Sequence, residues 1–262
     1  MQPTSLGPNL TGAIRSPAAV RAMTEAADAL TPFDDIDTSD MEAHKLAFIA
    51  EADAVGSVPV PATAGGIVKA AVSKLAGGQP TILLDKLGER LAYERAGVRL
   101  YDALIVKYRA AQQAEGDVLP PARALLTGDA PASTEDPDET LARIRAEEFE
   151  HFNLLCEAIT GLGGDPTAQT PCADVTAVAS SGFMQVLNDP RTTLAQCLNA
   201  MLAVELADNA GWELLASLAD EAGQSDLAGR FLGALGQEQE HLTIVKAWLT
   251  ALVSEASKSA AA

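Results

Sequence analysis

The sequence predicts an all-α protein built on four long helices that pack as a bundle. Three observations lead to this prediction. Apolar residues recur at alternating spacings of three and four in four separate segments, as in helices that share a buried seam. Each seam carries an acidic residue near its middle, and two of the seams repeat the motif Glu-x-x-His. Clusters of Gly, Pro and acidic residues separate the segments and indicate turns.

Composition narrows the class of protein. The chain has 262 residues and is 48% hydrophobic, which is enough to bury a large core. Its 36 acidic residues outnumber its 18 basic residues, and the formal charge of −18 opposes binding to nucleic acid or to an anionic membrane. No basic leader precedes an apolar run, and no stretch is apolar over the length of a bilayer. We therefore expect a soluble, cytoplasmic protein without nucleic-acid or membrane partners.

Residues 1–79 are expected to form an N-terminal arm of short helices that packs on the bundle. Gly, Pro, Ser and Thr are frequent in this region and indicate connecting turns. Ser16 before Pro17 is typical of a helix start, because a capping residue then precedes a first-turn proline. A further short helix is expected near residues 65–76.

The first long helix is expected from about residue 81 and should span about 45 Å, at 1.5 Å per residue. Its seam has a single charged member, Glu94, and consists of Leu84, Leu87, Leu91, Glu94, Val98, Tyr101, Ile105 and Tyr108. Gly, Pro and acidic residues then predict a long loop over residues 116–137.

The second long helix is expected to begin near Pro137 and to stop at the glycines before Pro166. Its seam contains the first Glu-x-x-His motif and consists of Leu141, Ile144, Glu148, His151, Leu155, Ala158 and Leu162. Residues 165–190 are numerous enough to run the length of the bundle, with one short helix near residues 174–187. Such a crossover would make the second and third long helices parallel.

The third and fourth long helices are separated by a short connection at Gly223, so they should be antiparallel neighbours. The third seam follows Pro190 and consists of Leu194, Leu198, Met201, Glu205, Asp208, Trp212 and Leu215. The fourth seam follows Ser225 and consists of Leu227, Phe231, Ala234, Glu238, His241, Val245, Trp248 and Leu252. The bundle is expected to cover residues 80–256, with a frayed tail at residues 257–262.

The acidic seam residues predict a metal centre. In each Glu-x-x-His motif the spacing places both side chains on one helix face, about one turn apart. Buried carboxylates require compensation, and no Lys or Arg occupies the four seams. Four glutamates balance two divalent cations, and carboxylate with imidazole suits iron or manganese rather than a thiolate zinc site. We therefore predict two metal ions bound by Glu94, Glu148, His151, Glu205, Glu238 and His241.

The order of these six ligands along the chain resembles the ferritin-like superfamily of di-iron carboxylate proteins. The resemblance covers about residues 80–256, and the stretch LLDKLGERLAYERAGVRLYDAL is similar to bacterial ferritin-like domain proteins. It implies a four-helix bundle with a long crossover, and two iron ions, or manganese in one or both places. It also implies that Glu94 and Glu205 are terminal ligands and that Glu148 and Glu238 are bridging ligands. Paired CxxC motifs like those of rubrerythrins are absent, so an external electron donor is expected.

Three further seam residues are candidates at the centre. Asp208, one turn beyond Glu205, is expected to accept a hydrogen bond from a ligand histidine, to bind metal itself, or to accept from a buried hydroxyl. Tyr101 and Trp212 stand seven residues after Glu94 and Glu205, and they either pack the core or relay electrons. The residues beside the two Glu-x-x-His motifs are expected to face solvent: Glu147, Glu150, Gln237 and Glu240.

Three functions fit these features. The first is an oxidoreductase that activates dioxygen or peroxide, with an organic molecule or peroxide as substrate. The second is an iron-handling protein that oxidises ferrous ion, and the third is a structural or binding module that metal stabilises. An apolar pocket at the centre would favour an organic substrate, and an acidic path to the centre would favour iron handling. We favour the first function; the oligomeric state stays open, with a homodimer as one candidate.

Overall fold

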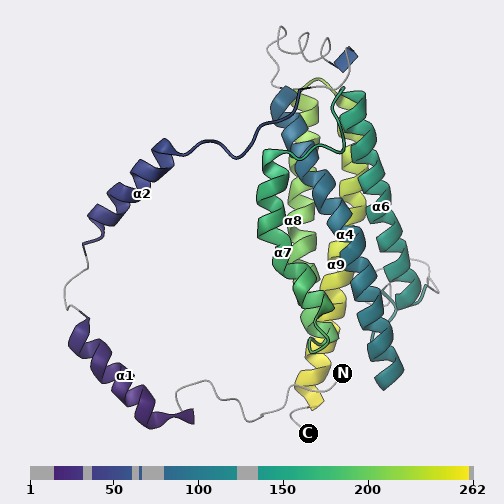
Figure 1. Cartoon of the computed structure of the whole chain (residues 1–262). Helices are drawn as coiled ribbons and strands as arrows, with labels where there is room; N and C mark the ends of the chain where they lie inside the picture. Colours follow the sequence, from purple (N-terminus) through teal and green to yellow (C-terminus); the bar gives the residue numbers. More distant parts are fainter. Residues whose placement is uncertain (1–14, 32–36, 61–64, 67–79, 123–134, 260–262) are drawn as a thin grey trace. The chain divides into compact units, whose positions relative to one another are not determined.

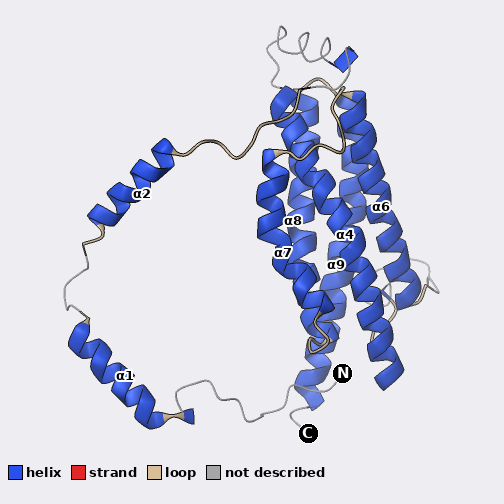
Figure 2. Cartoon of the chain, in the orientation of Figure 1, coloured by secondary structure: helices blue, strands red, loops and turns tan. Residues whose placement is uncertain are grey.

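A computed structural model describes residues 15–31, 37–60, 65–66, 80–122 and 135–259 of the chain. The secondary structure of these residues is entirely helical (Figure 2), which confirms the predicted all-α class. The chain divides into two compact units, one of residues 3–54 and one that consists mainly of residues 55–262. None of the described helices combines the length and the apolar character that a membrane crossing requires.

The first unit contains two helices, α1 (Pro17–Leu30) and α2 (Ser39–Glu51). Pro17 occupies the first turn of α1, as its place after Ser16 predicts. The packing of this arm on the bundle stays a prediction. Residues 67–79, which include most of the other short helix expected in the arm, lie outside the described residues.

Among the described residues, the second unit has five long helices that lie side by side (Figure 1): α4 (Pro80–Glu115), α6 (Pro137–Gly161), α7 (Pro171–Asn188), α8 (Leu194–Glu221) and α9 (Ser225–Ser259). Four of them correspond to the predicted long helices, and α4 is longer than expected, with 36 residues. α7 is the short helix expected in the crossover, and it begins earlier because Thr170 caps it and Pro171 suits a first turn. α9 continues into the segment predicted to fray, and residues 260–262 lie outside the described part.

Local sequence fixes where the helices start and stop. Asp136 and Thr193 each form a capping box with the residue three positions later, at the starts of α6 and α8. Each box satisfies backbone N–H groups that the first turn of a helix leaves without partners. The turns after α6 and α8 contain Gly163 and Gly223, whose φ angles are 88° and 71°. These positive angles are ones that glycine adopts without a Cβ clash.

The connections set the direction of each helix. In Figure 1, α4 runs from the top of the view to the bottom, α6 returns, α7 runs down, α8 returns and α9 runs down. α6 and α8 are therefore parallel, and α8 and α9 are antiparallel, as the lengths of their connections predict. Lys107 of α4 contacts the turn between α7 and α8, where its Nζ donates to the carbonyl oxygens of Asp189 (2.7 Å) and Thr192 (3.1 Å).

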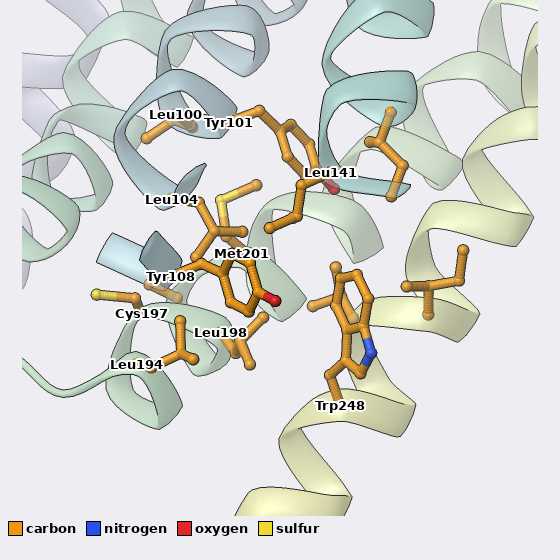
Figure 3. Close-up of a cluster of buried hydrophobic side chains, with 14 of the residues drawn as sticks. Leu100, Tyr101, Leu104, Tyr108, Leu141, Leu194, Cys197, Leu198, Met201 and Trp248 are labelled. Carbon is orange, nitrogen blue, oxygen red and sulfur yellow. The ribbon is translucent and has the colours of Figure 1, made fainter. Parts of the chain in front are cut away.

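Two apolar clusters fill the core of the second unit. The first, shown in Figure 3, takes side chains from α4, α6, α8 and α9 and includes Leu100, Leu104, Tyr108, Leu141, Leu198, Met201 and Trp248. The second includes Leu87, Leu91, Leu155, Trp212 and Phe231. Val98 and Ile105, predicted as seam residues, are only partly buried, because a straight helix drifts away from a strict seven-residue repeat. On each of the four helices, the acidic seam residues lie between the two clusters.

A glycine in α4 controls how closely the crossover packs. A Cβ added at Gly88 would lie 2.5 Å from Thr170 Cγ2, whereas one added at Gly182 of α7 meets nothing within 4 Å. Gly88→Ala should lower the free energy of unfolding, because overpacking of about 1–3 kcal/mol outweighs a helix-propensity gain of about 1 kcal/mol. Gly182→Ala should raise it by about 0.5–1 kcal/mol. Urea unfolding followed by circular dichroism measures both, and equal effects would contradict the close packing.

Candidate metal centre

All six predicted ligands lie together in the core of the second unit, and each is at most 2% exposed. Their ligand atoms fall into three overlapping groups, and within each group the atoms lie within 4.8 Å of one another. One group consists of Glu94, His151 and Glu238, a second of Glu148, Glu205, Glu238 and His241, and a third of Glu94, Glu148 and Glu238 with Asp208. Glu238 belongs to all three groups, which is the placement that a bridging carboxylate requires.

Each of the six side chains has a buried polar atom without a hydrogen-bond partner among the described residues. These atoms are Glu94 Oε2, Glu148 Oε2, His151 Nδ1, Glu205 Oε2, both carboxylate oxygens of Glu238, and His241 Nδ1. His151 Nδ1 lies 2.7 Å from Glu238 Oε1, but the direction of this contact does not make a hydrogen bond. Unsatisfied buried atoms are rare in proteins, and here they are the oxygen and imidazole donors that iron and manganese bind. The residues present therefore fit two such ions.

The outer nitrogen of each histidine contacts the other Glu-x-x-His helix. His241 Nε2 lies 2.7 Å from Glu147 Oε2, and His151 Nε2 lies 2.9 Å from Gln237 Oε1. Because both partner atoms are oxygens that accept, each Nε2 carries a proton and donates it. This arrangement orients each ring and directs Nδ1 toward the centre, as outer partners of metal-bound histidines do.

The prediction that the neighbours of the motifs face solvent is wrong for Glu147 and Gln237. Both residues stand directly before a ligand glutamate, and from there each reaches across to the opposite helix. Glu150 and Glu240 are exposed, as predicted, although Glu240 accepts a hydrogen bond from Arg143 at 2.9 Å. The sequence contained an indication of these two contacts. The first residue of EEFEH and the first residue of QEQEH each have a side-chain oxygen that can accept a hydrogen bond.

Tyr101 and Trp212 donate hydrogen bonds to Glu205 and Glu94, each on the opposite helix. The Tyr101 hydroxyl donates to Glu205 Oε1 at 2.5 Å, and the Trp212 Nε1–H donates to Glu94 Oε1 at 2.9 Å. Each bond engages one carboxylate oxygen and leaves the second unpaired. The two rings therefore do more than pack the core, and their role in electron transfer stays a prediction.

A buried ion pair lies beside Glu94. Arg90 is 4% exposed, and its Nη1 donates to Asp208 Oδ1 at 2.5 Å and to the Asp208 carbonyl at 3.1 Å. No Lys or Arg belongs to the four predicted seams, but Arg90 is buried beside the first of them, because it lies one turn before Glu94 and shares its helix face. Asp208 thus binds a guanidinium, where the sequence suggested a histidine or a hydroxyl as its hydrogen-bond partner.

Two glycines create the space for these side chains. A Cβ added at Gly97 would lie 2.1 Å from Glu148 Oε2, and one added at Gly211 would lie 2.2 Å from Arg90 Nη1. Both are interior helix positions, where glycine weakens a helix relative to alanine. Sequence reasoning missed both, although a glycine in the middle of a long helix is a signal of close approach.

The buried charges shift one another's pKa values. Burial, together with the charge of Glu238, raises the pKa of Glu205 to about 8. Burial opposes the charged form of Glu238 as well, but the two histidines lower the pKa of Glu238 to about 2. Burial would lower the pKa of His151, but Glu238 and Glu94 raise it to about 11. At neutral pH the centre therefore holds protons that bound cations would displace.

Comparison of the chain with protein-family models, with curated proteins and with solved structures gives no match.

Metal binding should release protons at pH 7. Glu205 and His151, with pKa values of about 8 and about 11, are protonated in the metal-free protein at this pH, whereas metal ligands must be deprotonated. Manganese(II) added to metal-free protein in weakly buffered solution should therefore acidify it, and metal affinity should rise with pH. A pH electrode and titrations at several pH values measure both effects. Binding without proton release would contradict the assigned protonation states.

Glu147→Gln tests the contact with His241. The substitution keeps an oxygen that accepts from Nε2 but removes the carboxylate charge, which makes the site resemble that of Gln237. We expect the affinity for one metal to fall by up to about tenfold, because a neutral amide raises the basicity of a ligand histidine less than a carboxylate does. Glu150→Gln, an exposed change on the same helix, is the control and should have no effect. Equal affinities in the two variants would contradict the role of Glu147.

Proposed function

We propose that α4, α6, α8 and α9 form a ferritin-like four-helix bundle around a di-metal centre, and that the protein is an oxidoreductase acting on dioxygen or peroxide. One observation carries the proposal. Six ligands chosen from sequence spacing alone are buried at one level of the core, each with an unpaired donor atom. The ions would be held by Glu94 and His151 on one side, by Glu205 and His241 on the other, and by Glu148 and Glu238 between them.

Two bound iron ions would supply one-electron redox steps and a site for dioxygen or peroxide. The protein supplies fixed ligand positions. Tyr101 and Trp212 restrain one oxygen of each terminal glutamate, and Glu147 and Gln237 restrain the histidines. Glu238 has neither oxygen hydrogen-bonded, so its carboxylate is the one best able to change its binding mode as the charge of the centre changes.

The charged side chains on the outer side of the proposed metal centre favour a permanently bound pair of metal ions over a route along which ferrous ions pass. Arg143 donates to Glu135 at 3.0 Å, to Glu147 at 3.0 Å and to Glu240 at 2.9 Å. A route for cations is expected to present carboxylates without a competing positive charge. Here a guanidinium lies among the acidic groups next to His241, and it opposes the approach of a cation from that side.

A small cavity lies in the second unit, away from the predicted ligands. Its volume of about 20 Å³ accommodates about one water molecule. It is lined by residues near the start of α7, away from the ligands, including Val58, Leu84, Gly88, Ile159 and Thr170. Electrons would come from an external donor, because the sequence lacks the paired CxxC motifs of an electron-transfer module.

A ferrous-ion titration in a stopped-flow instrument tests the proposal. Metal-free protein is loaded anaerobically with increasing ferrous ion and mixed with dioxygen or peroxide, while absorbance is followed. For a resident di-iron centre, the amplitude of the oxidation should stop growing at about two ferrous ions per chain. His241→Ala should lower both the metal content and this amplitude, because it removes a ligand.

Other outcomes select other functions. Oxidation that continues well beyond two ferrous ions per chain would identify an iron-handling protein. Iron-loaded protein that reacts with neither oxidant would instead identify a structural module. Elemental analysis that finds neither iron nor manganese in protein from metal-replete cells would overturn the metal centre itself.

A further inference from the structure

Asp208 lies outside the duplicated ligand pattern. It follows Glu205 by one turn on α8, and the equivalent position on α4, three residues after Glu94, is Gly97. Asp208 is 1% exposed, and its Oδ1 accepts from Arg90, whereas its Oδ2 has no hydrogen-bond partner among the described residues. A buried carboxylate oxygen without a partner is costly, so its presence indicates a ligand.

The position of Asp208 shows where that ligand would lie. One oxygen of Asp208 lies within 4.8 Å of oxygens of Glu94, Glu148 and Glu238. Neither group of ligand atoms that contains a histidine includes Asp208, but the Asp208 group shares Glu94 with the His151 group and not with the His241 group. The two candidate metal positions therefore differ, and only the position beside Glu94 has this extra carboxylate.

Arg90 orients the Asp208 carboxylate. The guanidinium lies over the Tyr93 ring, with Cζ 4.1 Å from the ring centroid, and it also donates to the Asp208 carbonyl. Gly211 leaves room for it, because a Cβ there would lie 2.2 Å from Arg90 Nη1. Arginine–carboxylate pairs are frequently bidentate, with both carboxylate oxygens engaged. This one uses Oδ1 and leaves Oδ2 unpaired.

The charges remain balanced when both residues are counted. The guanidinium of Arg90 offsets the charge of Asp208, so the four glutamates still match two divalent cations. Removing one member of a buried pair is strongly destabilising, which is consistent with Arg90 and Asp208 occurring together. The pair thus supplies an additional oxygen donor without changing the net charge of the centre.

We infer that Asp208 is a fifth carboxylate ligand, which binds the metal on the Glu94 and His151 side and makes the two metals inequivalent. This inference rests on the proposed di-metal centre. The Glu94 side offers more oxygen donors than the His241 side, and hard cations such as manganese(II) favour oxygen. The position beside Glu94 is therefore the tighter manganese(II) position.

Asp208→Asn separates the ligand role from the ion pair. The asparagine carbonyl still accepts from Arg90, whereas its amide nitrogen replaces Oδ2 and does not bind a metal. Manganese(II) is titrated into the metal-free full chain, and the unbound ion is measured by electron paramagnetic resonance. Wild type should bind two ions per chain. The variant should keep one at wild-type affinity and lose at least about tenfold in affinity for the other.

A matched control is available at Asp102, which pairs with Arg145 at 2.9 Å between α4 and α6 on the exposed surface. Asp102→Asn weakens an Arg–Asp pair away from the ligands and should leave both manganese affinities unchanged. If circular dichroism shows that Asp208→Asn does not fold, the double change Arg90→Met and Asp208→Asn removes both charges. The same loss at one position is then expected from that chain.

The outcomes are distinguishable. Two unchanged affinities in folded Asp208→Asn, or the loss of both ions from it, would overturn the role of Asp208. Fewer than two manganese ions bound by wild type would overturn the di-metal centre instead.

Discussion

The burial of five carboxylates in one helical core is the constraint on which the rest of the structure depends. They belong to Glu94, Glu148, Glu205, Asp208 and Glu238, and each is at most 1% exposed. Removing a carboxylate from water is unfavourable unless hydrogen bonds or opposite charges compensate. The histidines, Arg90, Tyr101 and Trp212 supply part of that compensation, and the unpaired atoms that remain are those that the proposed cations would bind.

The compensation follows a two-fold pattern in which α4 and α6 correspond to α8 and α9. Tyr101 and Trp212 each donate to the glutamate of the opposite helix. Glu147 and Gln237 each accept from the opposite histidine. The pattern breaks in two ways: one histidine contacts a carboxylate and the other an amide, and the Arg90 pair has no counterpart. A duplicated arrangement therefore gives two metal positions that differ in charge and in donors.

The surrounding fold isolates this polar layer from water. One apolar cluster lies on each side of it along the helices, so water is excluded from both directions. The crossover helix α7 returns the chain to the end where α6 began, and this makes α6 and α8 parallel (Figure 1). With these directions, side chains near the middle of every long helix meet at one level. Electrostatic interactions are strong in such a dry layer, which suits redox chemistry with a small oxidant.

The sequence by itself determined the helical class, the four long helices, the direction of the crossover and the six candidate ligands that the fold brings together. These features depend on spacing within one helix, and spacing decides which side chains share a face. Tertiary structure alone decided the partners of those ligands. Glu147 and Gln237 act on histidines of another helix, and Arg90 fits only because Gly211 on a facing helix lacks a side chain. Such contacts depend on how neighbouring helices are rotated and how closely they approach, which no periodicity within a single helix encodes.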